Sequence, residues 1–391
     1  MATPKLRFKE FEGSWLASKI GEVFKVTSGA TPLRSNKEFF KNANIPWVKT
    51  TDLNNAVITH TEEQISKVAL KSTSVKMLPK GTVFVAMYGG FNQIGRTGLL
   101  ANEATCNQAL SAIYPNENID SRFLLDYLNH NVKLWKIFAA SSRKDPNITK
   151  GDVLAFPFNF PNIAEQTKIA TFLSAVDTKI DELTQKHELL TDYKKGMMQQ
   201  LFSQKLRFKA DDGSDFEDWD DVLIEDIFTV TRGKVLAATE TKPEPTPEYC
   251  YPVFSSQTKN NGLMGFFSNY LFEDAITWTT DGAHAGDVNF RSGQFYCTNV
   301  CGVLLSDKGY SNMCIAGILD SIAHKYVSYV GNPKLMNNVM AKIPICIPSN
   351  IEEQTKIANF LTAIDQKINN VAEQIDHAKT WKKGLLQQMF V

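Results

Sequence analysis

Two long stretches of the chain carry apolar residues at steps that alternate between four and three positions. One stretch runs through 162–204 and the other through 350–391. This spacing indicates a heptad seam on an amphipathic helix, and a helix of about 40 residues is about 60 Å long. The seam positions are Ile169, Leu173, Val176, Ile180, Leu183, Leu190 and Met197 in the first stretch, and Ile357, Leu361, Ile364, Ile368, Val371, Ile375, Leu385 and Met389 in the second.

The two stretches are copies of one another. Residues 162–202 align with 350–390 at an offset of 188, with 20 of 41 positions identical. Each copy begins after a proline with the spacing of a capping box, Asn162 before Glu165 and Asn350 before Glu353. Because an apolar stripe has to be buried, each copy is the natural partner of the other, packed antiparallel. His187, Lys194 and Lys382 interrupt the seam, where we expect them either to extend toward solvent or to set the register, with no chemical role.

The segments before the copies also echo one another. The string KLRF occurs at 5–8 and again at 205–208, and IGEVFKVTSG at 20–29 parallels IEDIFTVTRG at 224–233. Short β-branched and aromatic runs between Gly-, Asn- and Thr-rich loops predict strands, with helices around 120–140 and 311–325. The predicted fold is α+β: two pseudo-symmetric globular domains, 1–161 and 205–349, alternating with spacer helices 162–204 and 350–391 that form an antiparallel intramolecular coiled coil. The N-terminal segment is expected beside the end of the second helix.

Composition changes this picture only where it is uneven. The net charge is zero, yet residues 1–161 hold 20 basic and 13 acidic residues, a net of +7, while 203–349 hold 12 and 18, a net of −6. Nine of those 18 acids lie between Asp211 and Asp226, so the remainder is 12 − 9 = +3. Both segments therefore permit DNA binding. We expect the acidic run to face away from DNA, toward solvent or a partner.

Two classes of protein are disfavoured by the same composition. The longest apolar runs are too short for a transmembrane helix, so no membrane partner is expected. The six cysteines include no Cys-x-x-Cys pair, so a structural zinc site is not expected and a cytoplasmic location is.

Taken together, these features resemble the DNA-specificity subunit of type I restriction–modification systems. The resemblance covers the whole chain and rests on the two helices that begin Asn-Ile-x-Glu-Gln-x-Lys-Ile-Ala and on the openings around Trp15 and Trp219. It implies two target recognition domains, each reading half of a bipartite, gapped site on double-stranded DNA. It also implies a spacer that docks two methyltransferase subunits, further restriction subunits, and no catalysis by this chain. The resemblance further implies that this chain binds no cofactor, and that S-adenosylmethionine, ATP and Mg²⁺ bind the partner subunits.

Because the two domains are similar but not identical, the site should be asymmetric. Base reading needs amide, hydroxyl, guanidinium and ammonium groups on loops. The candidate DNA-binding residues in the first domain are Thr31, Arg34, Lys49, Thr50, Thr51, Asn54, Tyr88, Phe91, Asn92, Gln93, Arg96, Arg143 and Lys144. Those in the second are Arg232, Lys234, Ser255, Ser256, Gln257, Lys259, Asn260, Asn261, Thr279, Thr280, His284, Arg291 and Asn337.

Other motifs carry less weight. The run Gly90–Thr97 is one residue short of a phosphate-binding loop and has Arg96 where that loop needs Lys. The triplet His60-Thr61-Glu62 resembles part of a deaminase site but lacks the downstream Pro-Cys-x-x-Cys. No Asn-Pro-Pro-Tyr or Gly-x-Gly-x-x-Gly motif is present for a methyltransferase. The alternatives that remain are a stand-alone DNA-modifying enzyme with an unrecognised site and a coiled-coil scaffold.

Overall fold

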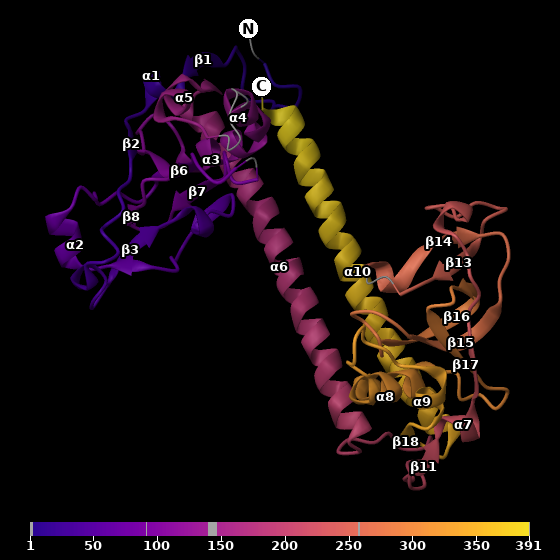
Figure 1. Cartoon of the computed structure of the whole chain (residues 1–391). Coiled ribbons are helices and arrows are strands. Elements are labelled where there is room, and N and C mark those ends of the chain that lie inside the picture. Colours follow the sequence, from indigo (N-terminus) through magenta and orange to yellow (C-terminus); the bar gives the residue numbers. More distant parts are fainter. Residues whose placement is uncertain (1–2, 91, 140–146, 257–258, 391) are drawn as a thin grey trace. The chain divides into compact units, whose positions relative to one another are not determined.

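The computed structural model describes residues 3–90, 92–139, 147–256 and 259–390 (Figure 1). It divides into two compact units. Unit 1 comprises 1–183 and 374–391, and unit 2 comprises 184–373. Each unit holds one globular domain, called domain 1 and domain 2 below, together with one half of each long helix.

The two long helices are present and pair as predicted. Helix α6 spans Ile163–Phe202 and helix α10 spans Ile351–Met389. In unit 1 the start of α6 shares a core with the end of α10, through Leu173 and Leu385. In unit 2 the end of α6 shares a core with the start of α10, through Leu201 and Leu361. The pairing is therefore antiparallel in both units, which confirms the predicted coiled coil.

The seam is buried at most of its predicted positions. Leu190, Met197 and Ile368 are only half-buried, and the other predicted seam residues are buried. The exposure of Ile368 has a visible cause, since its side chain lines a cavity between the helix pair and domain 2.

Domain 1 is built around a five-stranded sheet of order β2-β9-β6-β7-β4. These strands are β2 Val26–Ser28, β4 Ala56–Ile58, β6 Val83–Ala86, β7 Thr97–Leu100 and β9 Leu110–Ile113. A smaller sheet of order β5-β3-β8 contains β3 Ile45–Val48, β5 Gln64–Ile65 and β8 Thr105–Cys106, and β1 Leu16–Lys19 pairs with β10 Pro157–Phe160. The helices are α1 Ile20–Val23, α2 Lys67–Ser72, α3 Ser121–His130, α4 Val132–Ala139 and α5 Lys150–Ala155.

Domain 2 contains a six-stranded sheet of order β12-β17-β15-β16-β13-β14. Its strands are β12 Thr229–Arg232, β13 Tyr251–Phe254, β14 Leu263–Phe267, β15 Phe272–Thr279, β16 Val288–Cys297 and β17 Cys301–Leu305. Strand β11 Asp220–Leu223 pairs with β18 Pro344–Ile347. The helices are α7 Ile224–Ile227, α8 Met313–Ala323 and α9 Asn337–Ala341.

The strand pairings of the two domains correspond, as the echoed sequences predict. Antiparallel β2·β9 matches β12·β17, and β1·β10 matches β11·β18. The parallel pair β3·β8 matches β13·β16. The domains differ in how far these pairs are joined, because β3·β8 belongs to a separate three-stranded sheet whereas β13·β16 is part of the large one.

The N-terminal segment lies beside the end of α10, as predicted. In unit 1 the Leu6 N–H donates to the Gln388 carbonyl at 2.9 Å. In unit 2 the Leu206 N–H donates to the Gln200 carbonyl at 3.2 Å. Gln388 and Gln200 occupy the same position of the repeat. A non-covalent junction in unit 1 thus reproduces the continuous one in unit 2.

Candidate nucleic-acid interface

Each domain is fastened to its long helix by the same buried ion pair. The Arg7 guanidinium donates to both carboxylate oxygens of Glu165 at 2.8 and 2.7 Å, and Trp15 Nε1 lies 3.4 Å from Glu165 Oε1. In unit 2, Arg207 donates to both carboxylate oxygens of Glu353 at 3.0 and 2.8 Å, and Trp219 Nε1 donates at 3.2 Å. Both glutamates are fully buried.

This geometry corrects the capping-box prediction. The Asn162 side chain does accept from the Glu165 N–H at 3.0 Å, as an N-cap should. The glutamate carboxylate, however, is held by arginine and tryptophan of the preceding domain and does not reach back to the N-cap. In the second copy, Asn350 accepts from the Glu352 N–H at 2.7 Å. The Asn-x-x-Glu spacing that both copies repeat therefore marks a joint between domain and helix.

The residue after each glutamate is also shared by helix and domain. The Gln166 amide donates to the Pro161 carbonyl at 2.8 Å and accepts from the Asp120 N–H at the start of α3. Gln354 donates to the Pro348 carbonyl at 2.8 Å and accepts from the Asn312 amide at the start of α8. Because both amides are buried and satisfied, each domain is held in one orientation on its half of the helix pair.

The lysines that interrupt the seam form ion pairs between the helices. In unit 2, Lys194 Nζ lies 2.6 and 2.8 Å from the two oxygens of Asp365. In unit 1, Lys382 Nζ lies 2.5 Å from Asp177. The two pairs are repeat equivalents, and they act between antiparallel helices, so they support the register role predicted for these lysines.

In domain 1, three of the predicted DNA-binding residues belong to one charge network with two glutamates. Arg34 lies 2.5 Å from Glu63, and Lys49 lies 3.0 Å from Glu62 and 2.9 Å from Glu63. The Thr51 hydroxyl donates to Glu62 at 3.2 Å. The hydrogen bonds that Lys49 donates to Glu63 and Glu62 raise the pKa of its ammonium group. No local pattern in the sequence places these glutamates here, since the triplet that contains Glu62 resembles only part of a deaminase site.

The Arg34 guanidinium also stacks on aromatic rings. Its Cζ lies 4.9 Å from the Phe40 ring and 5.0 Å from the Trp47 ring, which holds the planar group at the surface. The side chain stays 54% exposed, so it is accessible to a ligand.

The other candidates of domain 1 lie on loops. Thr31, Asn54, Tyr88 and Asn92 are exposed, and Thr50, Gln93 and Arg96 are half-buried. The Gly-rich loop that holds Tyr88, Asn92, Gln93 and Arg96 is packed on α4, where a Cβ at Gly95 would come within 2.4 Å of Trp135. Phe91, Arg143 and Lys144 lie outside the described residues.

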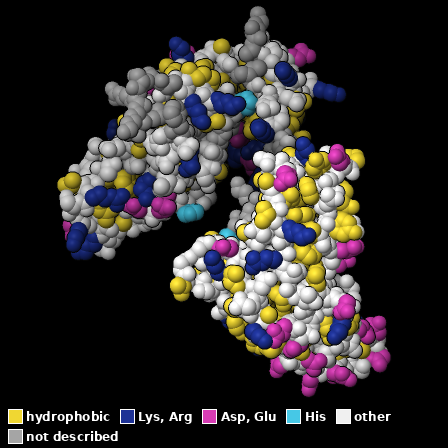
Figure 2. Space-filling view, turned by 45° about the vertical axis from the view of Figure 1, so that its right-hand side comes forward, with side chains coloured by type: hydrophobic (Ala, Val, Ile, Leu, Met, Phe, Trp, Pro, Cys, Tyr) yellow, Lys and Arg dark blue, Asp and Glu magenta, His cyan; other side chains and the backbone are white. Residues whose placement is uncertain are grey.

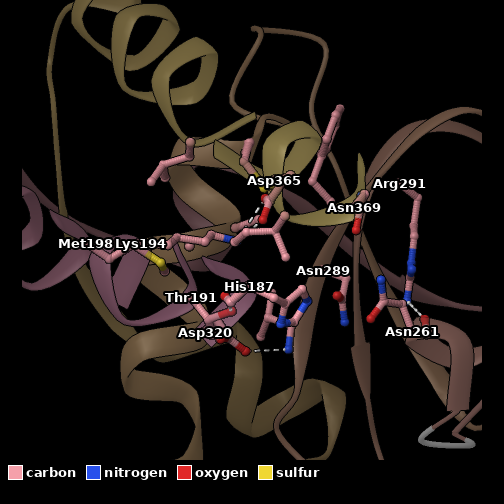
Figure 3. Close-up of a pocket in the computed structure, with 17 residues that line it drawn as sticks. His187, Thr191, Lys194, Met198, Asn261, Asn289, Arg291, Asp320, Asp365 and Asn369 are labelled. Atoms are coloured by element: carbon pink, nitrogen blue, oxygen red, sulfur yellow. Dashed lines mark hydrogen bonds and ion pairs between the residues drawn. The ribbon is translucent and has the colours of Figure 1, made fainter. Parts of the chain in front are cut away.

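In domain 2, several predicted residues line two adjoining cavities of about 580 and 340 Å³. Figure 3 shows the larger one. Ser255, Asn261, Thr279 and Arg291 are among the lining residues of the smaller one. Arg291 donates from Nε to Thr277 Oγ1 at 3.1 Å and from Nη2 to the Asn261 carbonyl at 2.8 Å. Burial lowers its pKa to about 10, so the guanidinium remains charged at neutral pH.

The larger cavity adds residues that the sequence did not single out as readers. They are Asn289 on β16, His187 and Thr191 on α6, and Asn369 on α10. For Thr191 and Asn369 the signal is weak, because a polar residue on the outer side of a coiled coil is expected whether or not it touches a ligand.

The remaining candidates of domain 2 are scattered. Arg232, Lys234, Asn260 and His284 are exposed, and Ser256 is half-buried. Asn337 is half-buried and donates to the Thr231 carbonyl at 3.1 Å. The structure contradicts the prediction that Thr280 contacts DNA. Thr280 is only 5% exposed and its hydroxyl donates to the Val300 carbonyl, so it cannot reach a base. Gln257 lies outside the described residues, as does the side chain of Lys259.

The acidic run lies at the strand β11 end of unit 2. Asp211 is 92% exposed and lies 2.5 Å from Lys356, and Asp215 is 84% exposed and lies 3.3 Å from Lys209. Figure 2 shows acidic side chains gathered at the lower end of this unit. That the acidic run faces away from DNA stays a prediction.

The described part of the chain contains neither a metal-binding cluster nor a membrane-spanning helix. Within residues 3–90, 92–139, 147–256 and 259–390, no three His, Cys, Asp or Glu side chains come together as a metal site. None of the helices described combines the length and the apolar character that crossing a membrane requires.

Comparison with known proteins identifies the family. A family model described as "Type I restriction modification DNA specificity domain" matches residues 12–191 and 216–378. A putative type I specificity subunit of Mycoplasma pneumoniae is 30% identical over 233 residues, covering 59% of this chain and 83% of that protein. The EcoR124I/EcoR124II specificity subunit of Escherichia coli is 28% identical over 186 residues, covering 46% of this chain and 45% of that one.

A solved structure shares the fold over the whole chain. The S subunit of the type I restriction–modification system from M. genitalium superposes with a TM-score of 0.69 at 17% identity, covering 100% of this chain and 99% of that one. The two family matches coincide with domain 1 and domain 2 and their helix halves. The chain belongs to the type I restriction–modification DNA specificity family and is a specificity subunit with two target recognition domains.

Proposed function

We propose that this specificity subunit directs its complex to a bipartite, asymmetric and gapped site on double-stranded DNA. Domain 1 reads one half-site and domain 2 reads the other. The observation that carries the proposal is that two identical joints hold two different reading surfaces. Domain 1 offers the charge network of Arg34 and Lys49 with two glutamates, whereas domain 2 offers an amide-lined cavity around Arg291. Different surfaces select different base edges.

The long helices set the gap between the half-sites. Each is continuous over 40 or 39 residues, without a break in its helical pattern. Two readers on a stiff spacer can engage B-DNA only where their half-sites present compatible faces, and this recurs with the helical turn of about 34 Å. The register pairs of Lys194 and Lys382 support a fixed spacing, because a one-heptad slip would separate each from its aspartate.

Two modification subunits dock on the outer side of the helices. In unit 1, Phe172 contacts both Phe8 and Trp381, at ring distances of 5.8 and 6.1 Å, and Trp381 is 54% exposed. In unit 2, the repeat-equivalent pair Phe208–Phe360 lies at 5.7 Å, and Tyr193, the equivalent of Trp381, is 51% exposed. Exposed aromatic rings at equivalent positions suit two copies of one partner.

The chain carries no catalytic centre in this proposal. Adenine methylation belongs to the docked modification subunits with their S-adenosylmethionine. Translocation and cleavage belong to restriction subunits with ATP and Mg²⁺.

The test is to co-express the chain with its own modification subunits and to map methylated adenines across a host genome. A single gapped motif with two unlike halves supports the proposal. Methylation by the chain alone would show a stand-alone enzyme instead. An assembled complex that binds DNA without sequence preference would leave only a scaffold.

A further inference from the structure

The larger cavity of unit 2 has walls from two different parts of the subunit. One wall is the helix pair, with His187 on α6 and Asn369 on α10. The opposite wall is domain 2, with Asn289 and Arg291 on β16 and Asn261 in the turn before β14 (Figure 3). A ligand of domain 2 that enters this cavity therefore also meets the spacer.

Two amide side chains in the cavity have unused hydrogen-bonding capacity. No side-chain hydrogen bond of Asn289 or Asn369 is found among the described residues, and Asn369 is exposed. The His187 ring is likewise without a partner there. Each amide has two N–H donors, so the cavity presents a group of donors that only solvent or a ligand can use.

One positive charge in the cavity is held in a fixed position. Arg291 is locked in place by its two hydrogen bonds and by stacking on Phe254 at 3.8 Å, so its positive charge is fixed. The charges of Lys194 and Asp365 offset one another at 2.6 Å. Asp320 accepts from the Val288 N–H and is the remaining acidic side chain of the lining. A fixed cation among free amide donors is the pattern that holds a phosphate.

The helix wall indicates which part of the DNA would enter the cavity. In the proposed function the spacer sets the gap, whose base pairs are unread, so we expect a contact made from the spacer to be independent of sequence. We propose that this cavity binds the phosphodiester backbone of DNA at the gap edge of the domain 2 half-site, with Asn369 and Asn289 donating to one phosphate. This inference rests on the proposed function.

The site should exist on one side of the gap only. The repeat equivalent of Asn369 is Asp181, and that of His187 is Ile375. Asp181 is exposed and acidic, so it would repel a phosphate where Asn369 would bind one.

The experiment is ethylation interference on the assembled complex and a fragment that contains its own methylation motif. The wild-type complex should show a phosphate at the domain 2 edge of the gap whose ethylation blocks binding, with none at the mirror position. Asn369→Ala should abolish that interference and weaken binding about 10- to 100-fold, the effect of one hydrogen bond to a charged group. The methylated motif should stay unchanged.

The matched control is Asn370→Ala, because Asn370 is an exposed asparagine next to Asn369 that does not line the cavity. It should leave affinity and interference unchanged. If Asn369→Ala changes a base of the domain 2 half-site, the amide reads bases and the backbone proposal is wrong. An unchanged affinity with unchanged interference would also overturn it. A wild-type complex with no bipartite motif would instead refute the proposed function.

Discussion

Removing Arg207 should destabilise unit 2, because it leaves a buried carboxylate without its cation. Its guanidinium is the main partner of the Glu353 carboxylate, whose side chain is 1% exposed, whereas Arg207 itself is 23% exposed. Without it, a buried carboxylate keeps only the Trp219 N–H at 3.2 Å. Breaking a buried pair on one side costs 3–5 kcal/mol, and because Arg207 is partly solvated we expect Arg207→Ala to cost about 3 kcal/mol.

Equilibrium urea unfolding of the full chain, followed by tryptophan fluorescence and far-UV circular dichroism, measures this cost. Arg7→Ala provides the matched variant, since Arg7 holds Glu165 in unit 1 with the same geometry and its side chain is 14% exposed. The two costs should agree within about 1 kcal/mol, the usual spread between contexts. The double variant Arg207→Met, Glu353→Leu should recover most of the loss, because it leaves no buried charge.

The reasoning would be refuted if Arg207→Ala cost less than about 1 kcal/mol, the range of an exposed ion pair. It would also be refuted if the double variant were as unstable as the sum of its two single changes, since the carboxylate would then not depend on the arginine.

Three further outcomes are expected. A circular permutant that joins the ends by a short linker and opens the chain between Ser203 and Gln204 should keep the unfolding midpoint of the parent, because the Leu6–Gln388 junction already mimics a continuous chain; a lost far-UV spectrum would contradict this. The double variant Glu62→Gln, Glu63→Gln should free Arg34 and Lys49 from their ion pairs. In filter binding, the salt dependence of non-specific DNA binding should then become steeper, by up to about two phosphate contacts. An unchanged slope of affinity against salt concentration would exclude these cations from DNA contact. A thiol reagent near pH 8 should label exposed Cys250 first, while Cys106, whose pKa burial raises to about 12, should react only after unfolding; mass spectrometry of the folded protein that finds Cys106 labelled early would refute that burial.

The parts of the fold that the sequence predicts best are those that repeat. The heptad spacing and the 188-residue offset predict helices at 162–204 and 350–391, and the structure has them at Ile163–Phe202 and Ile351–Met389. Two independent copies of one pattern restrict the interpretation more than either copy alone. The strand echoes are confirmed for the same reason, since equivalent runs pair equivalently in both domains.

The parts that the sequence misses depend on contacts between distant residues. The local spacing of Asn162 and Glu165 is the same for a capping box and for a joint, and only the return of Arg7 to the helix separates them. Glu62 and Glu63 join Arg34 through a fold-back of β3 and β5 that no local pattern reveals. Thr280 resembles a loop residue in the sequence, yet its hydroxyl is drawn to a carbonyl 20 positions away.

The two repeat copies are alike in some parts of the subunit and differ in others, and these parts correspond to the different roles proposed for them. Arginine, glutamate, tryptophan and glutamine recur at both joints with nearly the same distances, because a tilted joint would misplace a whole domain. The reading surfaces share almost nothing, because two equal surfaces would read a symmetric site. The helix faces lie between these extremes: their seam is duplicated, but Asn369 faces a counterpart of opposite chemistry in Asp181. If the helices touch DNA as proposed, this difference confines the contact to the domain 2 side of the gap.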